Sequence, residues 1–160
     1  AMRRGYTVDD FMKIVDAFRE SFEDLYLATD VIVGFPGEGE REFMHTCELI
    51  EKVKPDNVNL TRFSPMPGTD AARMPQVNGR EVARRSRMLS ARCRAIGREQ
   101  NERYVRRVFD GLVTEPGEKG GYVARLPNYK PAILSDAKLG EFVDVKIIEA
   151  RPTYLLGVKT

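Results

Sequence analysis

The sequence is poor in the residues that build metal sites and disulfide frameworks. It holds one histidine, His45, and two cysteines, Cys47 and Cys93, without the spacing of a disulfide framework. A lone histidine supports no metal site, and two thiols within helical patterns are typical of a reduced, cytosolic protein. No apolar run reaches the roughly 20 residues that cross a bilayer, and we expect no signal peptide. We therefore expect a cytoplasmic chain without membrane contact.

The formal net charge of +2 conceals an uneven distribution of charge along the chain. Residues 1–78 carry 9 Lys or Arg against 14 Asp or Glu, and residues 79–107 carry 10 Arg against 3 Glu. Residues 108–160 carry 7 charges of each sign. A strongly basic segment beside an acidic one can bind an anionic partner or dock on its acidic neighbour.

The first, acidic region alternates helical and strand patterns. Thr7 predicts a helix start, and apolar residues follow it at helical spacing: Phe11, Ile14, Val15, Phe18 and Phe22. An apolar stretch that ends at Val33 predicts a buried strand over 25–33. A second helix is expected over 40–53 and a second strand over 57–63. This order indicates a layered α/β fold with parallel strands.

The rest of the chain divides into a loop, a long helix and a β-rich end. Prolines and glycines between 64 and 79 exclude long regular structure. Residues 80–104 predict one helix with a narrow apolar stripe and arginine on its other faces. Short strands are then expected at 105–114, 122–126, 132–134, 141–148 and 154–158. Such a series is typical of a small all-β barrel of the OB-like type.

Two βα repeats make a poor domain by themselves, because a two-stranded parallel sheet keeps open edges and needs cover on both faces. Either the segment completes itself by self-association, or it is the distal part of a larger barrel. The residues favour the second. We therefore expect an incomplete α/β barrel over 1–78, a basic connecting helix over 79–104 and an all-β, OB-like barrel domain over 105–160.

Four motifs in register carry a family resemblance. The first is the strand end Asp30–Glu38, reading DVIVGFPGE, and the second is the loop Phe63–Ala72, reading FSPMPGTDAA. The third is the NYKP stretch at 128–131 with the later Leu-Gly pairs at 139 and 156, and the fourth is MRRGYT at 2–7. Together they resemble the radical S-adenosylmethionine methylthiotransferases, which close in an RNA-binding TRAM domain.

The resemblance implies a radical-SAM barrel for the first region and iron–sulfur chemistry that this sequence cannot support alone. Members of the family bind one cluster in an amino-terminal domain and a second, 4Fe–4S cluster through Cys-x-x-x-Cys-x-x-Cys in the barrel. This sequence lacks both cysteine sets, and such a cluster needs three nearby thiolates. We assign no catalytic residue and no metal ligand. We expect no cofactor on this chain alone, and a missing amino-terminal part of the polypeptide as its partner.

The same resemblance implies that S-adenosylmethionine binds where the predicted strands end, which is where barrel sites form. The expected contacts are Gly34, Phe35, Pro36, Gly37, Glu38, Ser64 and Thr69. The alternatives are a tight turn with Glu38 merely exposed and a Pro-rich linker at 64–69. Two positions depart from the family pattern. Gly39 stands where a threonine is frequent, which weakens the helix cap, and Met66 stands where an arginine is frequent.

The expected partner of the basic and aromatic residues is tRNA. Small barrels bind single-stranded nucleic acid by stacking bases on aromatic rings beside a positive groove. The expected RNA contacts are Arg103, Arg106, Arg107, Tyr122, Arg125, Asn128, Tyr129 and Lys130. The alternative is that the tyrosines pack in the barrel wall and the arginine helix docks on acidic residues of 1–78. We expect a mixed case, in which one helix face docks and another meets RNA.

The resulting prediction is the carboxyl-terminal part of a tRNA methylthiotransferase, with this chain inactive by itself. By resemblance, the enzyme adds a methylthio group to an adenosine next to the anticodon. The motifs at 64–72 and 128–131 are most similar to the archaeal and eukaryotic branch, whose target is threonylcarbamoyladenosine. Two alternatives remain: a sibling enzyme that methylthiolates a ribosomal protein, and a non-enzymatic RNA-binding protein that retains only the recognition half.

Overall fold

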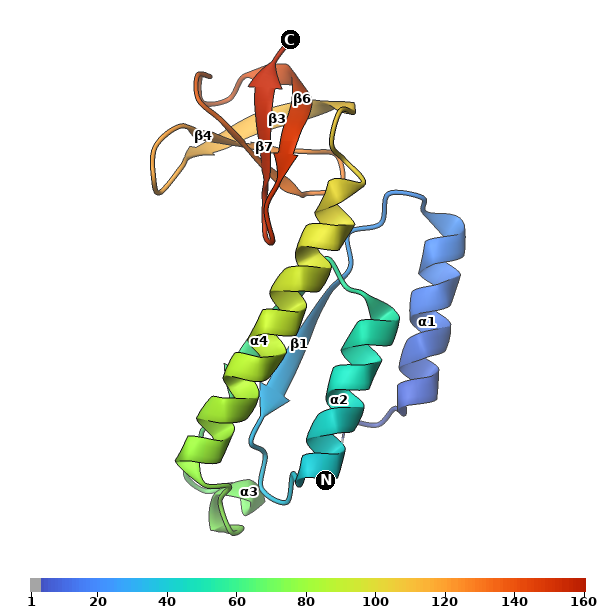
Figure 1. Cartoon of the computed structure of the whole chain (residues 1–160), viewed down its shortest axis with the longest axis vertical. Coiled ribbons are helices and arrows are strands. Elements are labelled where there is room, and N and C mark those ends of the chain that lie inside the picture. Colours follow the sequence, from blue (N-terminus) through green and yellow to red (C-terminus); the bar gives the residue numbers. More distant parts are fainter. Residues whose placement is uncertain (1–3) are drawn as a thin grey trace.

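The computed structural model describes residues 4–160 and shows an α/β unit packed alongside one long helix, with a β-barrel at the end of that helix (Figure 1). The elements are α1 (Val8–Ser21), β1 (Ala28–Val33), α2 (Glu40–Val53), β2 (Asn57–Arg62), α3 (Asp70–Arg73), α4 (Gly79–Glu102), β3 (Val108–Pro116), β4 (Tyr122–Arg125), β5 (Pro131–Leu134), β6 (Phe142–Ala150) and β7 (Leu155–Lys159). No helix within the described residues is long and apolar enough to span a membrane. Met2 and Arg3 of the fourth motif lie outside the described residues.

The α/β unit is built on two parallel strands, as the sequence predicts. β1 and β2 pair in register from Ala28 opposite Asn57 to Val33 opposite Arg62. Helices α2 and α4 pack on these strands, and the buried core between them consists of Val33, Phe43, Cys47, Ile50, Leu89 and Ile96. α2 begins at Glu40, and its N-cap Gly39 provides no capping side chain, whereas the Glu42 carboxylate accepts the Gly39 amide at 3.0 Å. This hydrogen bond is one half of a capping box; the half that a threonine side chain would supply is missing.

Helix α1 forms where predicted, but its apolar face is largely uncovered. Only Val15 is buried, whereas Ile14, Phe18 and Phe22 are 57%, 50% and 55% exposed. Within residues 4–160, β1 and β2 pair only with each other. An apolar helix face and open strand edges of this kind need a covering partner.

The carboxyl-terminal unit is a closed five-stranded barrel with the strand order β3-β4-β5-β7-β6. Its pairs are antiparallel except β5 with β7. The predicted alternation in β6 is confirmed: Val143, Val145 and Ile147 are buried, while the intervening residues are exposed. Gly157 permits the strands to close, since a Cβ at this position would lie 2.5 Å from a methyl of Val145.

Helix α4 packs along the α/β unit and leads from it into the barrel. It has 24 residues, which corresponds to about 36 Å at the usual rise per residue. Its first turns lie beside α3 and the carboxyl ends of the strands, and its last turn reaches the barrel (Figure 1). The short helix α3 lies within the stretch predicted as loop, and four residues are too few to show a helical period.

Candidate functional site

The carboxyl ends of β1 and β2 form one continuous edge, so the two predicted cofactor-binding segments lie side by side. The Phe63 amide donates to the Val33 carbonyl at 2.8 Å. The rings of Phe35 and Phe63 meet edge to face with centroids 5.2 Å apart. Gly34 and Gly37 both adopt left-handed backbone, with φ of 80° and 88°. Glycine adopts this conformation without steric cost, which gives the turn its sharp reversal.

Glu38 stabilises this turn from inside, and its side chain is engaged by the protein. One carboxylate oxygen accepts the Gly34 amide at 3.0 Å, and the other pairs with Arg85 at 2.7 Å. Arg85 also donates to the Glu38 carbonyl at 2.8 Å, and its side chain is only 6% exposed. Because both oxygens already have protein partners, we correct the expectation that Glu38 contacts a cofactor. It positions the turn instead.

Ser64 and Thr69 lie on the second segment of the edge, and both are exposed. The Thr69 hydroxyl accepts the Ala72 amide at 3.3 Å and donates to the Met66 carbonyl at 2.8 Å. Thr69 therefore acts as the amino-terminal cap of α3. The structure brings Ser64 next to the Gly34–Glu38 turn through Phe63 and places Thr69 at the start of α3.

The arginines of α4 that face the α/β unit are paired with its acidic residues. Arg84 pairs with Glu40 and Glu81, and Arg92 pairs with Glu51 at 3.0 Å. Hydrogen bonds from Arg84 and then Arg85 lower the pKa of Glu81 to about 2. The expectation that one face of this helix docks on acidic residues of 1–78 is thus confirmed. Contact of the outward face with RNA stays a prediction.

Lys130 is the main difference between the predicted and observed sites. It is 1% exposed, and its ammonium donates to Asp56 at 2.8 Å and to Asn101 at 2.6 Å. The rings of Tyr26 and Tyr104 each lie with centroids 4.9 Å from the same nitrogen. Burial lowers the pKa of Lys130, and the hydrogen bond to Asp56 opposes that shift. The prediction that Lys130 contacts RNA is therefore wrong for this structure, because its charge is enclosed between the two units.

Asn128 and Arg107 extend the same interface. The Asn128 amide donates to the Asp24 carbonyl at 3.1 Å and to the Tyr104 hydroxyl at 2.9 Å. Arg107 pairs with the Asp24 carboxylate at 2.8 Å. The turn after β4, the end of α4 and the segment before β1 are thereby joined. Sequence reasoning missed the interface residues Asp24, Tyr26, Asp56 and Asn101, which lie in the segments before β1 and β2 and in the last turn of α4.

The other predicted RNA contacts divide into exposed and engaged side chains. Tyr129 is 76% exposed, and Arg103 and Arg106 are also exposed. Tyr129 and Arg106 have left-handed backbone, with φ of 65° and 73°. Arg125 pairs with Glu115 at 2.7 Å, and the half-buried Tyr122 packs against the barrel core. The barrel-wall alternative therefore describes Tyr122, while Tyr129 remains available to a ligand.

The described residues do not fit an iron–sulfur cluster. Among residues 4–160 no group of three His, Cys, Asp or Glu side chains could hold a metal ion. Cys47 is buried and Cys93 half-buried, and both are free thiols on the packed faces of α2 and α4. Burial raises the pKa of both thiols, which disfavours the thiolate that a cluster needs.

Comparison with known proteins shows which families this sequence resembles. Residues 102–160 match the family described as TRAM domain. Over 98% of its length the chain is 44% identical to a "Probable threonylcarbamoyladenosine tRNA methylthiotransferase" of Archaeoglobus fulgidus, and 45% identical to one of Pyrococcus horikoshii. It is 36% identical to a tRNA-2-methylthio-N(6)-dimethylallyladenosine synthase of Tropheryma whipplei, again over 98% of the chain. The chain spans 37% of the length of the two archaeal relatives and 35% of the third. Residues 102–160 therefore belong to the TRAM domain family, and the chain is similar over 98% of its length to the carboxyl-terminal part of archaeal tRNA methylthiotransferases.

Proposed function

We propose that the whole protein is a radical S-adenosylmethionine tRNA methylthiotransferase that modifies threonylcarbamoyladenosine beside the anticodon. The observation that carries this proposal is a single match running through 98% of the chain, across both the strand edge and the barrel. Identity to the archaeal proteins named for this substrate is 44% and 45%, against 36% for a protein named for dimethylallyladenosine. This difference favours the threonylcarbamoyl substrate.

In this proposal the strand edge forms one wall of the S-adenosylmethionine site. The backbone of Gly34–Gly37 and the side chains of Phe35, Ser64 and Thr69 line it, while Glu38 and Arg85 hold the turn from behind. The packed rings of Phe35 and Phe63 would keep water from this wall. When bound, S-adenosylmethionine supplies the radical and the methyl group of the reaction. The cluster ligands are assigned to segments outside this chain, since the described residues do not fit them.

The rest of the catalytic barrel is the proposed cover of α1 and of the open strand edge. The exposed side chains of Ile14 and Phe18 lie on one face of α1, and burying such a face is what stabilises a βα layer. We propose that preceding strands and helices of the same polypeptide pack there. The exposed face supports a larger barrel rather than a self-sufficient domain.

We propose that the barrel binds tRNA, and we call it the tRNA handle. Its position in the molecule constrains how the RNA lies. Arg103 and Arg106 follow the end of α4, and the neighbouring turn 127–129 is joined to it by the hydrogen bond from Asn128 to Tyr104. The carboxyl end of β1, which leads into the turn 34–38, lies at the other end of α4 (Figure 1). The length of α4, about 36 Å, therefore separates the handle from the strand edge. An RNA held by the barrel must extend along α4 to bring an adenosine to that edge, which suits a structured RNA rather than a free nucleoside.

The direct test is nucleoside analysis of tRNA from cells with and without the gene. The proposal predicts that deletion removes the methylthio derivative of threonylcarbamoyladenosine and leaves unmethylthiolated threonylcarbamoyladenosine in its place. It also predicts a Cys-x-x-x-Cys-x-x-Cys motif upstream in the coding sequence, which a non-enzymatic RNA-binding protein would lack. An unchanged nucleoside profile, or loss of the dimethylallyl derivative instead, would contradict the assigned substrate.

A further inference from the structure

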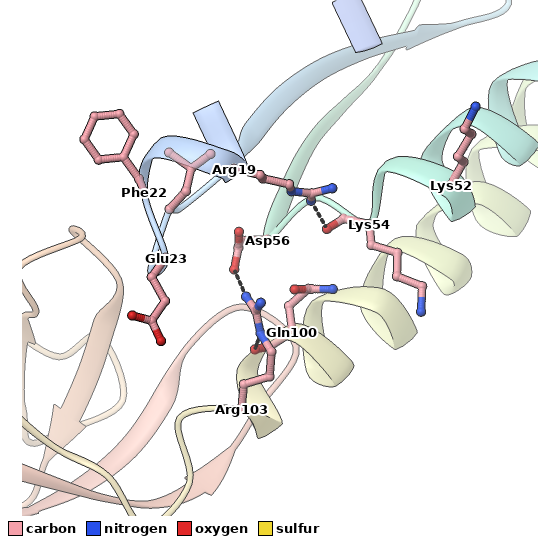
Figure 2. A pocket seen from close by; sticks show the side chains of 9 residues that line it. Arg19, Phe22, Glu23, Lys52, Lys54, Asp56, Gln100 and Arg103 are labelled. Carbon is pink, nitrogen blue, oxygen red and sulfur yellow. Dashed lines mark hydrogen bonds and ion pairs between the residues drawn. The ribbon is translucent and has the colours of Figure 1, made fainter. Parts of the chain in front are cut away.

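Two clefts meet where the α/β unit faces the barrel. The first, of about 380 Å³, is mostly polar and is bordered by Arg19, Lys52, Lys54, Asp56 and Arg103 (Figure 2). The second, of about 610 Å³, is mostly apolar and lies between the segment 21–26 and the turn 127–129. Phe22, Glu23 and Leu25 line both clefts, so the two form one groove with a charged and an aromatic half.

The charged half carries a positive excess, with four cationic and two acidic side chains on its lining. Part of this charge has an internal role. Arg19 donates to the Val53 carbonyl at 2.5 Å and to the Lys54 carbonyl at 3.1 Å, at the negative end of α2. Asp56 is neutralised by the buried Lys130.

Lys54 pairs with Glu99, so Lys52 and Arg103 carry the remaining positive charge of the groove. Within residues 4–160 Lys52 forms no ion pair, and the side chain of Arg103 is 52% exposed and 3.8 Å from Asp56. Arg103 points across the cleft toward Asp56 (Figure 2). Both cations are thus accessible to an anion. Unlike Arg19, neither of them is needed to bind the carbonyls at the end of α2.

The aromatic half presents two exposed rings from different units. Phe22 is 55% and Tyr129 is 76% exposed, and Tyr26 forms part of the wall behind them. Tyr129 holds a left-handed φ of 65°, which is uncommon for a non-glycine residue and unfavourable for a bulky one. Residues kept in such conformations cluster at ligand-binding sites. Phe22 and Tyr129 therefore offer an exposed aromatic ring to the same cleft, one from each unit.

We propose that this groove binds single-stranded RNA, with a base stacked on Tyr129 and Phe22 and its phosphates facing Arg103 and Lys52. An aromatic platform beside a positive groove is the combination that sequence-independent single-strand binders use. The proposal rests on the proposed function for the identity of the nucleic acid. It adds Phe22 and Lys52 of the α/β unit to the contacts and makes the groove a composite of both units.

The test is an equilibrium titration of the 160-residue chain with fluorescent hexauridylate, its abasic ribose-phosphate analogue and tRNA. One variant, Phe22→Ala with Tyr129→Asn, removes both rings while asparagine tolerates the left-handed backbone. A second, Lys52→Gln with Arg103→Gln, removes the two accessible cations. The matched controls are Phe142→Ala, a 78% exposed ring outside the groove, and Lys13→Gln with Arg41→Gln, two exposed cations outside it. Thermal unfolding of each variant verifies that it is folded.

The ring variant should bind hexauridylate about tenfold more weakly, within the range of one lost stacking contact, and bind the abasic analogue as the wild type does. In the cation variant, the slope of the logarithm of the association constant against the logarithm of the salt concentration should be shallower by about 1.4. This corresponds to about 0.7 for each of two lost phosphate contacts. Both controls should stay within about twofold, well below one stacking contact. Wild-type affinity for hexauridylate in the folded ring variant would overturn the groove proposal, as would failure of the wild type to bind that probe.

A further pair of outcomes separates this proposal from the function on which it rests. If tRNA binds and the groove variants bind it normally, the groove proposal fails and the tRNA handle stands. If tRNA does not bind but hexauridylate binds through the rings, the groove stands as a general single-strand site and the tRNA handle fails. Concentration-dependent dimerisation that the ring variant abolishes, with RNA binding unchanged, would identify a second copy of the chain as the occupant and overturn the proposal.

Discussion

Lys130 of the barrel lies 2.8 Å from Asp56 of the α/β unit, with the two side chains 1% and 2% exposed. Removing two charges from water is costly, and the cost is offset only by good geometry and further hydrogen bonds. Asn101 accepts from the same ammonium, and the Leu27 amide donates to the second Asp56 oxygen at 2.9 Å. The pair therefore holds the barrel in one orientation on the α/β unit.

Breaking this pair from one side should be strongly destabilising. Lys130→Met leaves a buried carboxylate and Asp56→Asn a buried ammonium, and each is expected to cost about 3–5 kcal/mol of unfolding free energy. The double variant should cost clearly less than the sum of the two, because neither uncompensated charge remains. Urea unfolding of the four proteins measures the coupling. Additive single effects would show that the two side chains do not depend on each other.

Glu81 supplies a pH-dependent contribution at the start of α4. Its pKa falls from 4.5 to about 2 in the folded protein, first through the hydrogen bond from Arg84 and then through that from Arg85. A lowered folded-state pKa means that the contribution is complete above pH 4.5 and disappears as the pH falls to about 2. Melting temperatures of the wild type and Glu81→Gln should therefore differ at pH 6 and converge near pH 2. A constant difference across this range would refute the assignment.

Gly34 tests whether the turn at the strand edge requires glycine for steric reasons. A Cβ there would meet a methyl of Val82 at 2.5 Å, and φ is 80°. Gly34→Ala should cost about 2–4 kcal/mol of stability, which combines left-handed strain with overpacking. Gly120→Ala is the matched control, since φ is 97° with open space around the Cβ, and it should cost only about 1–2 kcal/mol. Adding Val82→Ala should recover part of the stability that Gly34→Ala loses. It should recover none of the stability that the control, Gly120→Ala, loses.

The uncovered face of α1 should make the isolated chain self-associate. Ile14 and Phe18 are 57% and 50% exposed, and exposed apolar patches of this kind drive association. Ile14→Gln with Phe18→Gln should shift sedimentation toward the monomer and change the unfolding free energy by less than about 1 kcal/mol. Val15→Ala, at a position 2% exposed, should instead destabilise the chain without affecting association. A wild type that stays monomeric at high concentration would contradict this expectation.

Local patterns predicted the elements well because their causes are local. Thr7 and Asp10 cap α1 reciprocally, as their spacing suggests, and the alternation around Val145 matches its buried position. Long-range pairings were less predictable. Lys130 and Asn128 follow a strand as turn residues do, and nothing in the sequence reveals that this turn meets Asp56 and Asp24. Basic and amide side chains suit an RNA contact and a buried interface equally, so chemistry alone could not distinguish the two roles.

Glu38 illustrates the same limit at the strand edge. Its position after Gly37 predicts a site near the end of β1, and the structure places it there. Its partner Arg85 is 47 residues away along the chain, so no local sequence pattern indicates that the carboxylate has a protein partner. Residues without such distant partners, such as Tyr129, keep their predicted availability.

The most direct measurement is a titration of the 160-residue chain with tRNA at increasing salt. Three phosphate contacts, from Lys52, Arg103 and Arg106, predict that the association constant falls roughly 20-fold between about 50 and 200 mM salt, at about 0.7 per contact. The double variant Lys130→Met with Asp56→Asn should show the same dependence of tRNA affinity on salt under conditions in which it is folded, because the buried ammonium contacts no phosphate. Absence of binding at low salt, or an affinity independent of salt, would contradict the account of this chain as a tRNA handle.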